Sequence, residues 1–178
     1  KVKNDDDAKK IFGGDSIEGY PADHQLSQFF LTYLNFKVDQ WGKGKTLTDP
    51  HFLGLDQIMP HPEGTYTKPI LIVVDQLDFS GGDFFPAIMQ DNKRATIFGT
   101  RTAGAGGYVL SVQYPNIMGV QQFSVTGSIA ERVNMNPIEN LGVTPDIQYT
   151  LTEDDVRGGF RNYAQQIQKS MNELIEKK

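Results

Sequence analysis

The sequence predicts an α/β fold in which two parallel strands are joined by a helix. Residues 70–74 form an apolar run rich in β-branched side chains, which has the length of a buried strand. A helix is expected over about 82–91, and a second short strand over 95–99. A strand–helix–strand order of this kind implies a parallel pair with a right-handed crossover.

The segment before this unit, residues 1–68, is expected to be a lead-in with one helix and a polar loop. Residues 1–19 are polar and predict a partly ordered start. The helix is expected to begin at residues 21–23, where proline and aspartate favour initiation, and to continue with apolar side chains at helical spacing. Gly42 fits a C-terminal stop, and the residues after it have the composition of a loop.

The residues after the second strand predict a hairpin, a short strand and a terminal helix. Residues 108–114 and 120–126 are expected to form a hairpin with a longer loop. An irregular stretch follows, and then a short strand over 147–151. The acidic turn at 152–155 suits the start of a helix, and an apolar stripe predicts that a helix ends near Glu176.

Composition excludes several classes of function. The chain has 178 residues, which is one domain or a piece of a larger one, and an apolar content of 38% is enough for a core. Its net charge is −5 without a cluster of Lys and Arg, which argues against nucleic acid and anionic membrane surfaces as partners. It has no cysteine and no apolar run of about 18 residues, so disulfides, thiolate catalysis and a membrane span are not expected. Because the chain begins at Lys1 without methionine, we expect a mature fragment, an isolated domain or a cleavage product.

The turn between the first strand and its helix, residues 78–82 (DFSGG), has the pattern of a nucleophile site. A serine at such a turn has an exposed hydroxyl, and the glycines after it let a substrate approach the backbone. The alternative is structural, because Ser80-x-x-Asp83 also fits a capping box in which the serine satisfies a helix amide. Pro86 favours a helix that starts a few residues after Ser80, since proline is best tolerated in the first turn.

Glycines on both sides of this turn have expected roles of their own. The N–H of Gly81 follows the serine, so it is a candidate oxyanion donor at a helix N-terminus; the alternative is that Gly81 only turns the chain. The glycine-rich loop 99–107 lacks the lysine of a phosphate-binding loop. We expect it instead to present backbone edges to an extended peptide, with Gly104 and Gly106 as substrate-binding residues.

Other ionisable residues are assigned structural roles. Asp75 and Asp78 flank the turn and are expected to be solvated or to form turn hydrogen bonds, with orientation of the turn as the alternative. His24, His51 and His61 are expected at the surface rather than as a catalytic base. No pair has HxxxH spacing, so no metal site is expected.

Four stretches of the chain resemble the protease domain of the C-terminal processing (tail-specific) serine proteases, and their chlamydial-type members in particular: DFSGGDFFP, ATIFGTRTAGAGGY, IENLGVTPDI and LTEDDVRGGFRNY. The resemblance covers about residues 69–178, which would be the C-terminal part of the protease domain. It implies a crotonase-like core of repeated ββα units and hydrolysis of peptide bonds by a serine nucleophile, without a metal or organic cofactor. It also implies an extracytoplasmic location, either periplasmic or secreted.

The resemblance also implies how the serine is activated. Many members carry a lysine base in the glycine loop, but Ala105 stands at that position and cannot accept a proton. The chlamydial-type members use a serine–histidine–glutamate triad, which points to Ser80 and to Glu139 in the IENLG motif. Their histidine lies in an upstream half that this chain is expected to lack. We therefore expect the chain alone to be inactive and to pair with the N-terminal half of the same protease or with a second copy.

Two other interpretations remain open from the sequence. Without the resemblance, a loop carboxylate such as Glu139 is expected to be solvated. The fold would also suit a non-catalytic crotonase-like module that binds apolar ligands or peptides. A crotonase-like acyl-thioester enzyme would use a similar oxyanion hole. The absence of a basic cluster for the nucleotide of coenzyme A counts against that enzyme.

Overall fold

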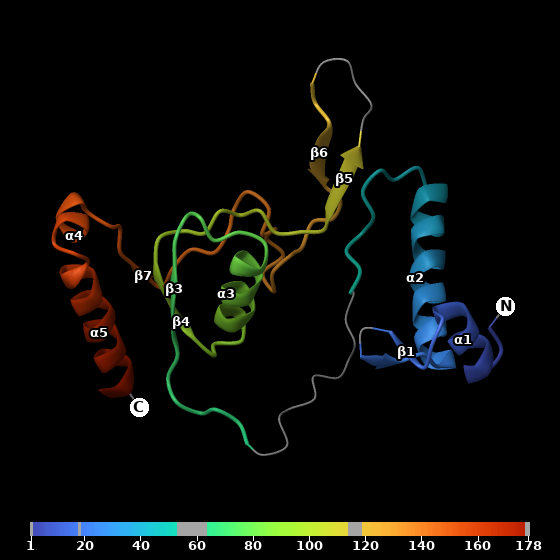
Figure 1. Cartoon of the computed structure of the whole chain (residues 1–178), viewed down its shortest axis with the longest axis horizontal. Helices are drawn as coiled ribbons and strands as arrows, with labels where there is room; N and C mark the ends of the chain where they lie inside the picture. The colour runs from blue at the N-terminus through green and yellow to red at the C-terminus, as the bar shows by residue number, and fades with distance from the viewer. Residues whose placement is uncertain (1, 18, 53–63, 114–118, 177–178) are drawn as a thin grey trace. The chain divides into compact units, whose positions relative to one another are not determined.

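The computed structural model describes residues 2–17, 19–52, 64–113 and 119–176 (Figure 1). The chain divides into two compact units, Lys1–Ile58 and Met59–Lys178, and each is described by itself. Among the described residues, none of the helices combines the length and the apolar character needed to cross a membrane.

The described part of unit 1 contains two helices and a very short antiparallel hairpin: α1 (Asp5–Phe12), β1 (Ser16–Ile17), β2 (Tyr20–Pro21) and α2 (His24–Gly42). The one helix predicted in residues 1–68 is confirmed as α2, with Asp23 as its N-cap and Gly42 as its last residue. The Asp23 carboxylate accepts a hydrogen bond from the N–H of Leu26 at 2.7 Å, which satisfies one of the free amides of the first turn. The sequence signal at residues 21–23 was therefore a capping signal.

The expectation of a partly ordered start was wrong for residues 5–12, which form α1. The side chain of Asn4 accepts a hydrogen bond from the N–H of Asp7, and Gly13 ends the helix at φ 77°. Three aspartates lie in the first turn and two lysines in the last, so the charges at both ends interact favourably with the helix dipole. These caps stabilise a short helix whose apolar content alone does not predict it.

Unit 2 is built on a three-stranded parallel sheet in the order β3-β4-β7. Its elements are β3 (Leu71–Val74), α3 (Gly81–Asp91), β4 (Thr96–Gly99) and β7 (Ile147–Gln148). The predicted strand–helix–strand unit is confirmed as a parallel pair, with Leu71 opposite Thr96 and Val74 opposite Gly99. The predicted strand 147–151 is shorter than expected, because only its first two residues pair with β4.

The core of unit 2 lies on the central strand. Ile97 and Phe98 on β4 are almost completely buried and, as neighbours in a strand, point to opposite faces of the sheet. Ile97 belongs to a cluster with Ala87 of α3. Phe98 lies against the ring of Tyr163 in the last helix at 6.0 Å between centroids. Figure 1 accordingly shows α3 and the last helix on opposite sides of the sheet.

The remaining elements of unit 2 are β5 (Val109–Gln113), β6 (Gln122–Thr126), α4 (Glu153–Arg157) and α5 (Arg161–Glu176). The predicted hairpin is confirmed: β5 and β6 pair antiparallel, with Val109 opposite Thr126. The acidic turn is also confirmed as a helix start, because Thr152 and Asp155 form a capping box at α4.

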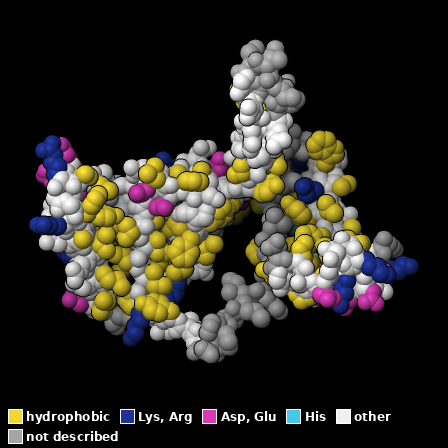
Figure 2. Space-filling view, viewed as in Figure 1, with side chains coloured by type: hydrophobic (Ala, Val, Ile, Leu, Met, Phe, Trp, Pro, Cys, Tyr) yellow, Lys and Arg dark blue, Asp and Glu magenta, His cyan; other side chains and the backbone are white. Residues whose placement is uncertain are grey.

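Hydrophobic side chains gather on the visible face of unit 2 (Figure 2). Several large apolar residues of this unit are exposed, among them Val73 on β3 and Phe85 and Ile88 on α3. A large exposed apolar surface commonly marks a site at which a protein binds a partner.

Candidate active site

Ser80 lies between β3 and α3, is exposed, and has backbone angles of φ 56° and ψ −115°. This combination is unfavourable for a residue with a side chain and costs on the order of 1–3 kcal/mol, so the surrounding structure must hold it in place. A sharp, strained strand-to-helix turn that exposes a serine hydroxyl is the geometry of the nucleophile in many hydrolases. The sequence predicted the turn, and the structure adds the strain.

The capping-box alternative for Ser80 is not observed. The Ser80 side chain makes no capping hydrogen bond, and its backbone N–H donates to the carbonyl of Ala105 at 3.1 Å instead of to Asp83. The hydroxyl is therefore not needed to begin the helix. The expectation of a later helix start was wrong as well: α3 begins at Gly81 and contains Pro86, whose burial in the core offsets the hydrogen bond that proline cannot make.

Gly81 is the first residue of α3, and its N–H donates to none of the described residues. The space beside Gly81 is open, because a Cβ added there would meet no atom within 4 Å. The next two amides, of Gly82 and Asp83, are already bound to the carbonyls of Phe79 and Ser80. The Gly81 N–H is thus a free donor at the positive end of a helix dipole, beside the serine hydroxyl.

Asp83 is a residue of the site that sequence reasoning assigned only to a cap. It is fully buried and binds the glycine loop: Oδ1 accepts from the Thr102 hydroxyl and from the N–H of Gly104 at 3.0 Å, and Oδ2 accepts from the N–H of Ala105 at 2.8 Å. All three donors lie outside α3, so this buried carboxylate does not serve as a cap of the helix that contains it. The loop 99–107 is therefore fastened to the helix that follows Ser80.

The two glycines predicted to bind substrate differ in what their backbone groups contact. Gly104 donates its N–H to Asp83 and accepts at its carbonyl from the N–H of Asn140 at 2.7 Å, so both groups are used within the protein. Gly106 is buried, and its N–H and carbonyl are bound to none of the described residues. The substrate-binding role of both residues stays a prediction.

Glu139 is half-buried and accepts a hydrogen bond at Oε1 from the hydroxyl of Thr126, at 3.1 Å. Its neighbour Asn140 adopts φ 63° and binds the carbonyl of Gly104, while Ser80 binds the carbonyl of Ala105. The backbone segments that carry the two predicted triad residues are therefore attached to adjacent residues of one loop. The roles of Ser80 and Glu139 in catalysis stay predictions.

Asp75 and Asp78 form hydrogen bonds within the turn. The N–H of Asp75 donates to Asp78 Oδ2 at 2.8 Å, and the N–H of Leu77 donates to Asp75 Oδ1 at 2.7 Å. The carbonyl of Asp78 also accepts from the N–H of Ala103. Both carboxylates thus shape the turn, as the structural interpretation expected.

The histidines of the described structure lie in unit 1. His24 begins α2, and the ring of His51 stacks on the ring of Phe36 at 4.2 Å between centroids. His61 lies outside the described residues. The described part of unit 2 thus contains no histidine, and the described residues hold no cluster of His, Asp and Glu able to bind a metal ion.

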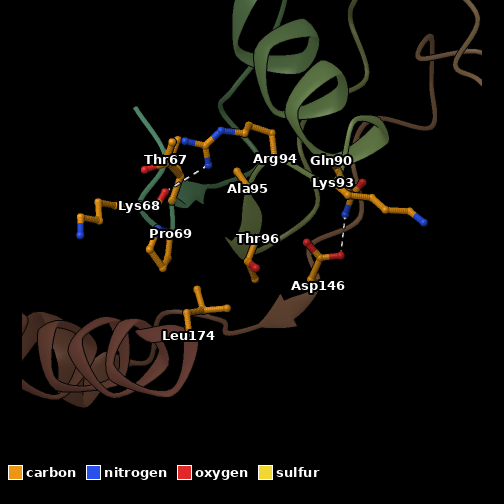
Figure 3. Close-up of a pocket in the computed structure, with 11 residues that line it drawn as sticks. Thr67, Lys68, Pro69, Gln90, Lys93, Arg94, Ala95, Thr96, Asp146 and Leu174 are labelled. Carbon is orange, nitrogen blue, oxygen red and sulfur yellow. Dashed lines mark hydrogen bonds between the residues drawn. The ribbon is translucent and has the colours of Figure 1, made fainter. Parts of the chain in front are cut away.

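Unit 2 has a cavity of about 440 Å³ whose lining residues, drawn in Figure 3, do not include Ser80. Its lining includes residues 67–70 before β3, residues 93–95 before β4 and Thr96 at the start of β4, which places it at the amino ends of these parallel strands. Ser80 and the loop 99–107 follow the carboxyl ends. In the cavity wall, the Arg94 side chain donates to the carbonyl of Lys68, and the Gln90 side chain donates to Asp146. These polar groups of the wall thus hold neighbouring segments together.

A serine on a strained turn at the carboxyl end of a parallel strand, beside a free helix amide, is an arrangement that suits a hydrolase with a serine nucleophile. The chain belongs to peptidase family S41, whose family model matches residues 22–149. The resemblance to the tail-specific proteases is thus confirmed. The match includes α2, which lies in unit 1.

Relatives and solved structures agree with this family. The chain is 44% identical over 169 residues to an uncharacterised protein of Chlamydia muridarum and 41% identical over 165 residues to a protein of Chlamydia trachomatis. It is similar to mature CPAF, with 39% identity and a TM-score of 0.79, and to mature CPAF complexed with lactacystin, with 38% identity and a TM-score of 0.78. These matches cover 91–93% of the chain for the two relatives and 99–100% for the two structures. The chain spans 28% of the length of the two relatives and 34% of each CPAF chain.

Proposed function

We infer that the complete protein is a serine endopeptidase in which Ser80 is the nucleophile. The observation that carries this proposal is the conformation of Ser80: an exposed serine at φ 56° whose side chain caps nothing. Residues held in such conformations cluster at active sites. Membership of peptidase family S41 and the likeness to CPAF support the same reaction.

In this reaction a histidine Nε2 removes the proton from Ser80 Oγ as the oxygen attacks the scissile carbonyl carbon. The negative charge that develops on the carbonyl oxygen is stabilised by the free N–H of Gly81 and by a second donor from another part of the protein. The imidazolium then gives its proton to the leaving amine, which departs and leaves an acyl group on Ser80. Water, deprotonated by the same histidine, then attacks the acyl carbonyl carbon. The bond from that carbon to Ser80 Oγ breaks, the imidazolium returns its proton to Oγ, and the acid product leaves and ionises to a carboxylate.

Glu139 is proposed to accept the other N–H of that histidine, which fixes the tautomer and stabilises the imidazolium. The histidine is proposed to come from a part of the protein outside this chain. The described part of unit 2 offers none, and the relatives are more than three times as long as the region they share with the chain. Residues 1–178 alone should therefore be inactive.

The substrate is proposed to be an extended polypeptide that pairs with the free backbone groups of Gly106 beside Ser80. The fold is proposed to be crotonase-like, and the exposed apolar residues of unit 2 to be covered by the N-terminal half of the same protease or by a second copy. An extracytoplasmic location is proposed from the family alone.

The experiment that tests this function is reaction of the complete protein with a fluorophosphonate, followed by peptide mapping. The expected result is a single labelled residue, Ser80, together with peptide hydrolysis that Ser80→Ala abolishes without a change in the unfolding midpoint. Peptide hydrolysis retained by Ser80→Ala would remove Ser80 from the mechanism. A wild-type protein that neither labels nor hydrolyses peptides would indicate a binding module instead.

A further inference from the structure

The buried carboxylate of Asp83 accepts from three donors that lie 19 to 22 residues further along the chain. An ionised carboxylate only accepts hydrogen bonds, so it matches a site in which every partner donates. The Thr102 hydroxyl donates its proton to Asp83, and its oxygen accepts from the N–H of Val143 at 2.7 Å. The carboxylate thus connects α3 with the loop 99–107, and through Thr102 with the segment after Glu139.

The part of the loop that Asp83 holds is the part that contacts both predicted catalytic segments. The carbonyl of Ala105 accepts the N–H of Ser80 at 3.1 Å, and the carbonyl of Gly104 accepts the N–H of Asn140 at 2.7 Å. The N–H groups of these same two residues donate to Asp83. Each of these two residues is therefore held by Asp83 at its N–H and by a predicted catalytic segment at its carbonyl.

We propose that Asp83 is a positioning residue that sets the distance between the Ser80 nucleophile and the Glu139 segment through residues 102–105. The proposal rests on the proposed function, because it assigns a role within that reaction. Asp83 is too deeply buried to touch a substrate, so its effect reaches the chemistry through the loop. A shift of the loop should slow the chemical step and affect substrate binding much less.

The test is Asp83→Asn in the complete protein. Asparagine keeps the size of the side chain but has one acceptor oxygen for three donors, and its NH₂ group would face at least one of them. We expect kcat per active site, counted by the end-point of fluorophosphonate labelling, to fall on the order of 10- to 100-fold. KM should change by less than about threefold.

A matched control is Asp155→Asn, because Asp155 is also buried and its carboxylate also accepts from three groups, the Tyr149 hydroxyl and the N–H and hydroxyl of Thr152. Asp155 belongs to α4, so its replacement should lower the unfolding midpoint while kcat per active site stays unchanged. A folded Asp83→Asn variant that behaves in the same way would overturn the positioning role.

A second pair of variants decides the question if Asp83→Asn does not fold. Thr102→Val removes one donor to Asp83 at nearly constant volume, and Thr102→Ser keeps the hydroxyl. The proposal expects kcat per active site to fall in the valine variant and to be retained in the serine variant; an unchanged kcat in Thr102→Val would overturn it. A wild-type protein that labels at Ser80 while these variants show no effect refutes the positioning role alone. A wild-type protein that fails to label refutes the proposed function and this inference with it.

Discussion

The N–H of Ser80 donates to the carbonyl of Ala105 at 3.1 Å, so the loop position at which many tail-specific proteases are expected to carry a lysine lies against the backbone of the proposed nucleophile. Alanine has no group that accepts a proton, and its contribution here is a backbone carbonyl. Another residue must therefore accept the proton of the serine hydroxyl. The contact also fixes the strained turn, because the carbonyl holds the amide of the residue that has the unfavourable φ.

Ser80→Gly should be more stable than Ser80→Ala, by about 1 kcal/mol or more in the free energy of unfolding. Glycine adopts φ 56° without the clash of a Cβ, whereas alanine keeps the strain of the native residue. Denaturant unfolding of both variants measures the difference. Ser170 in α5 is the control, because it lies inside a regular helix. There Ser170→Gly should have a free energy of unfolding about 1 kcal/mol lower than Ser170→Ala. Equal stability of the two Ser80 variants would show that the turn stores no strain.

Gly104→Ala should be strongly destabilising because of both space and backbone angle. An added Cβ would lie 2.7 Å from the N of Gly142 and 2.9 Å from the N of Leu141, and the residue has φ 73°. Gly159 has a similar φ of 65° but open space around its Cβ position. We expect Gly159→Ala to cost about 1 kcal/mol and Gly104→Ala about 2 kcal/mol more, measured by denaturant unfolding. Similar losses in the two variants would contradict the close approach of the loops.

Local sequence patterns were sufficient for the elements whose signal is local. The apolar run before the turn predicted β3, and the spacing of Asp23 and the apolar residues after it predicted α2. Helix α1 was missed because its stabilisation comes from Asn4, Gly13 and its charge order rather than from apolar periodicity. A search for caps would have found it.

The site was predictable only in part, for a physical reason. Ser80 and Gly81 were found because a nucleophile turn has a compact sequence pattern. Asp83 was read as a cap because Ser-x-x-Asp is a local motif, but its hydrogen-bond partners, Thr102, Gly104 and Ala105, are distant in sequence. A local pattern does not distinguish a carboxylate that caps its own helix from one that binds a distant loop. The strain at Ser80 is likewise imposed by tertiary contacts.

Glu139→Gln should lower kcat on the order of 10³-fold and leave KM within about twofold, because glutamine can no longer stabilise an imidazolium. Glutamine still offers an oxygen to the Thr126 hydroxyl, so the local contact is kept. Steady-state kinetics of the complete protein measure both constants. Glu131→Gln is the control on the same segment, since Glu131 is exposed, and it should behave as wild type. An unchanged kcat in Glu139→Gln would remove the glutamate from the triad.

Asp91 and Arg132 form an ion pair in which both side chains are largely buried, 15% and 13% exposed. The hydrogen bonds from Arg132, together with its charge, hold the pKa of the Asp91 carboxyl below its ordinary value, although burial acts in the opposite direction. A carboxyl whose pKa is lower in the folded protein stabilises the fold above its unfolded pKa of about 3.9 and loses that stabilisation as the pH falls through the folded pKa.

Asp91→Asn should therefore lower the free energy of unfolding by about 2 kcal/mol at pH 7, and the difference from wild type should narrow as the pH falls below about 4. Denaturant unfolding at pH 7 and at pH 3 measures both values. Asp39→Asn is the control: Lys43 also lowers the pKa of Asp39, but this pair is exposed and solvent screens it, so no loss of stability is expected at either pH. A difference between wild type and Asp91→Asn that is the same at both pH values would show that the pair acts through packing rather than through the charge of the carboxylate.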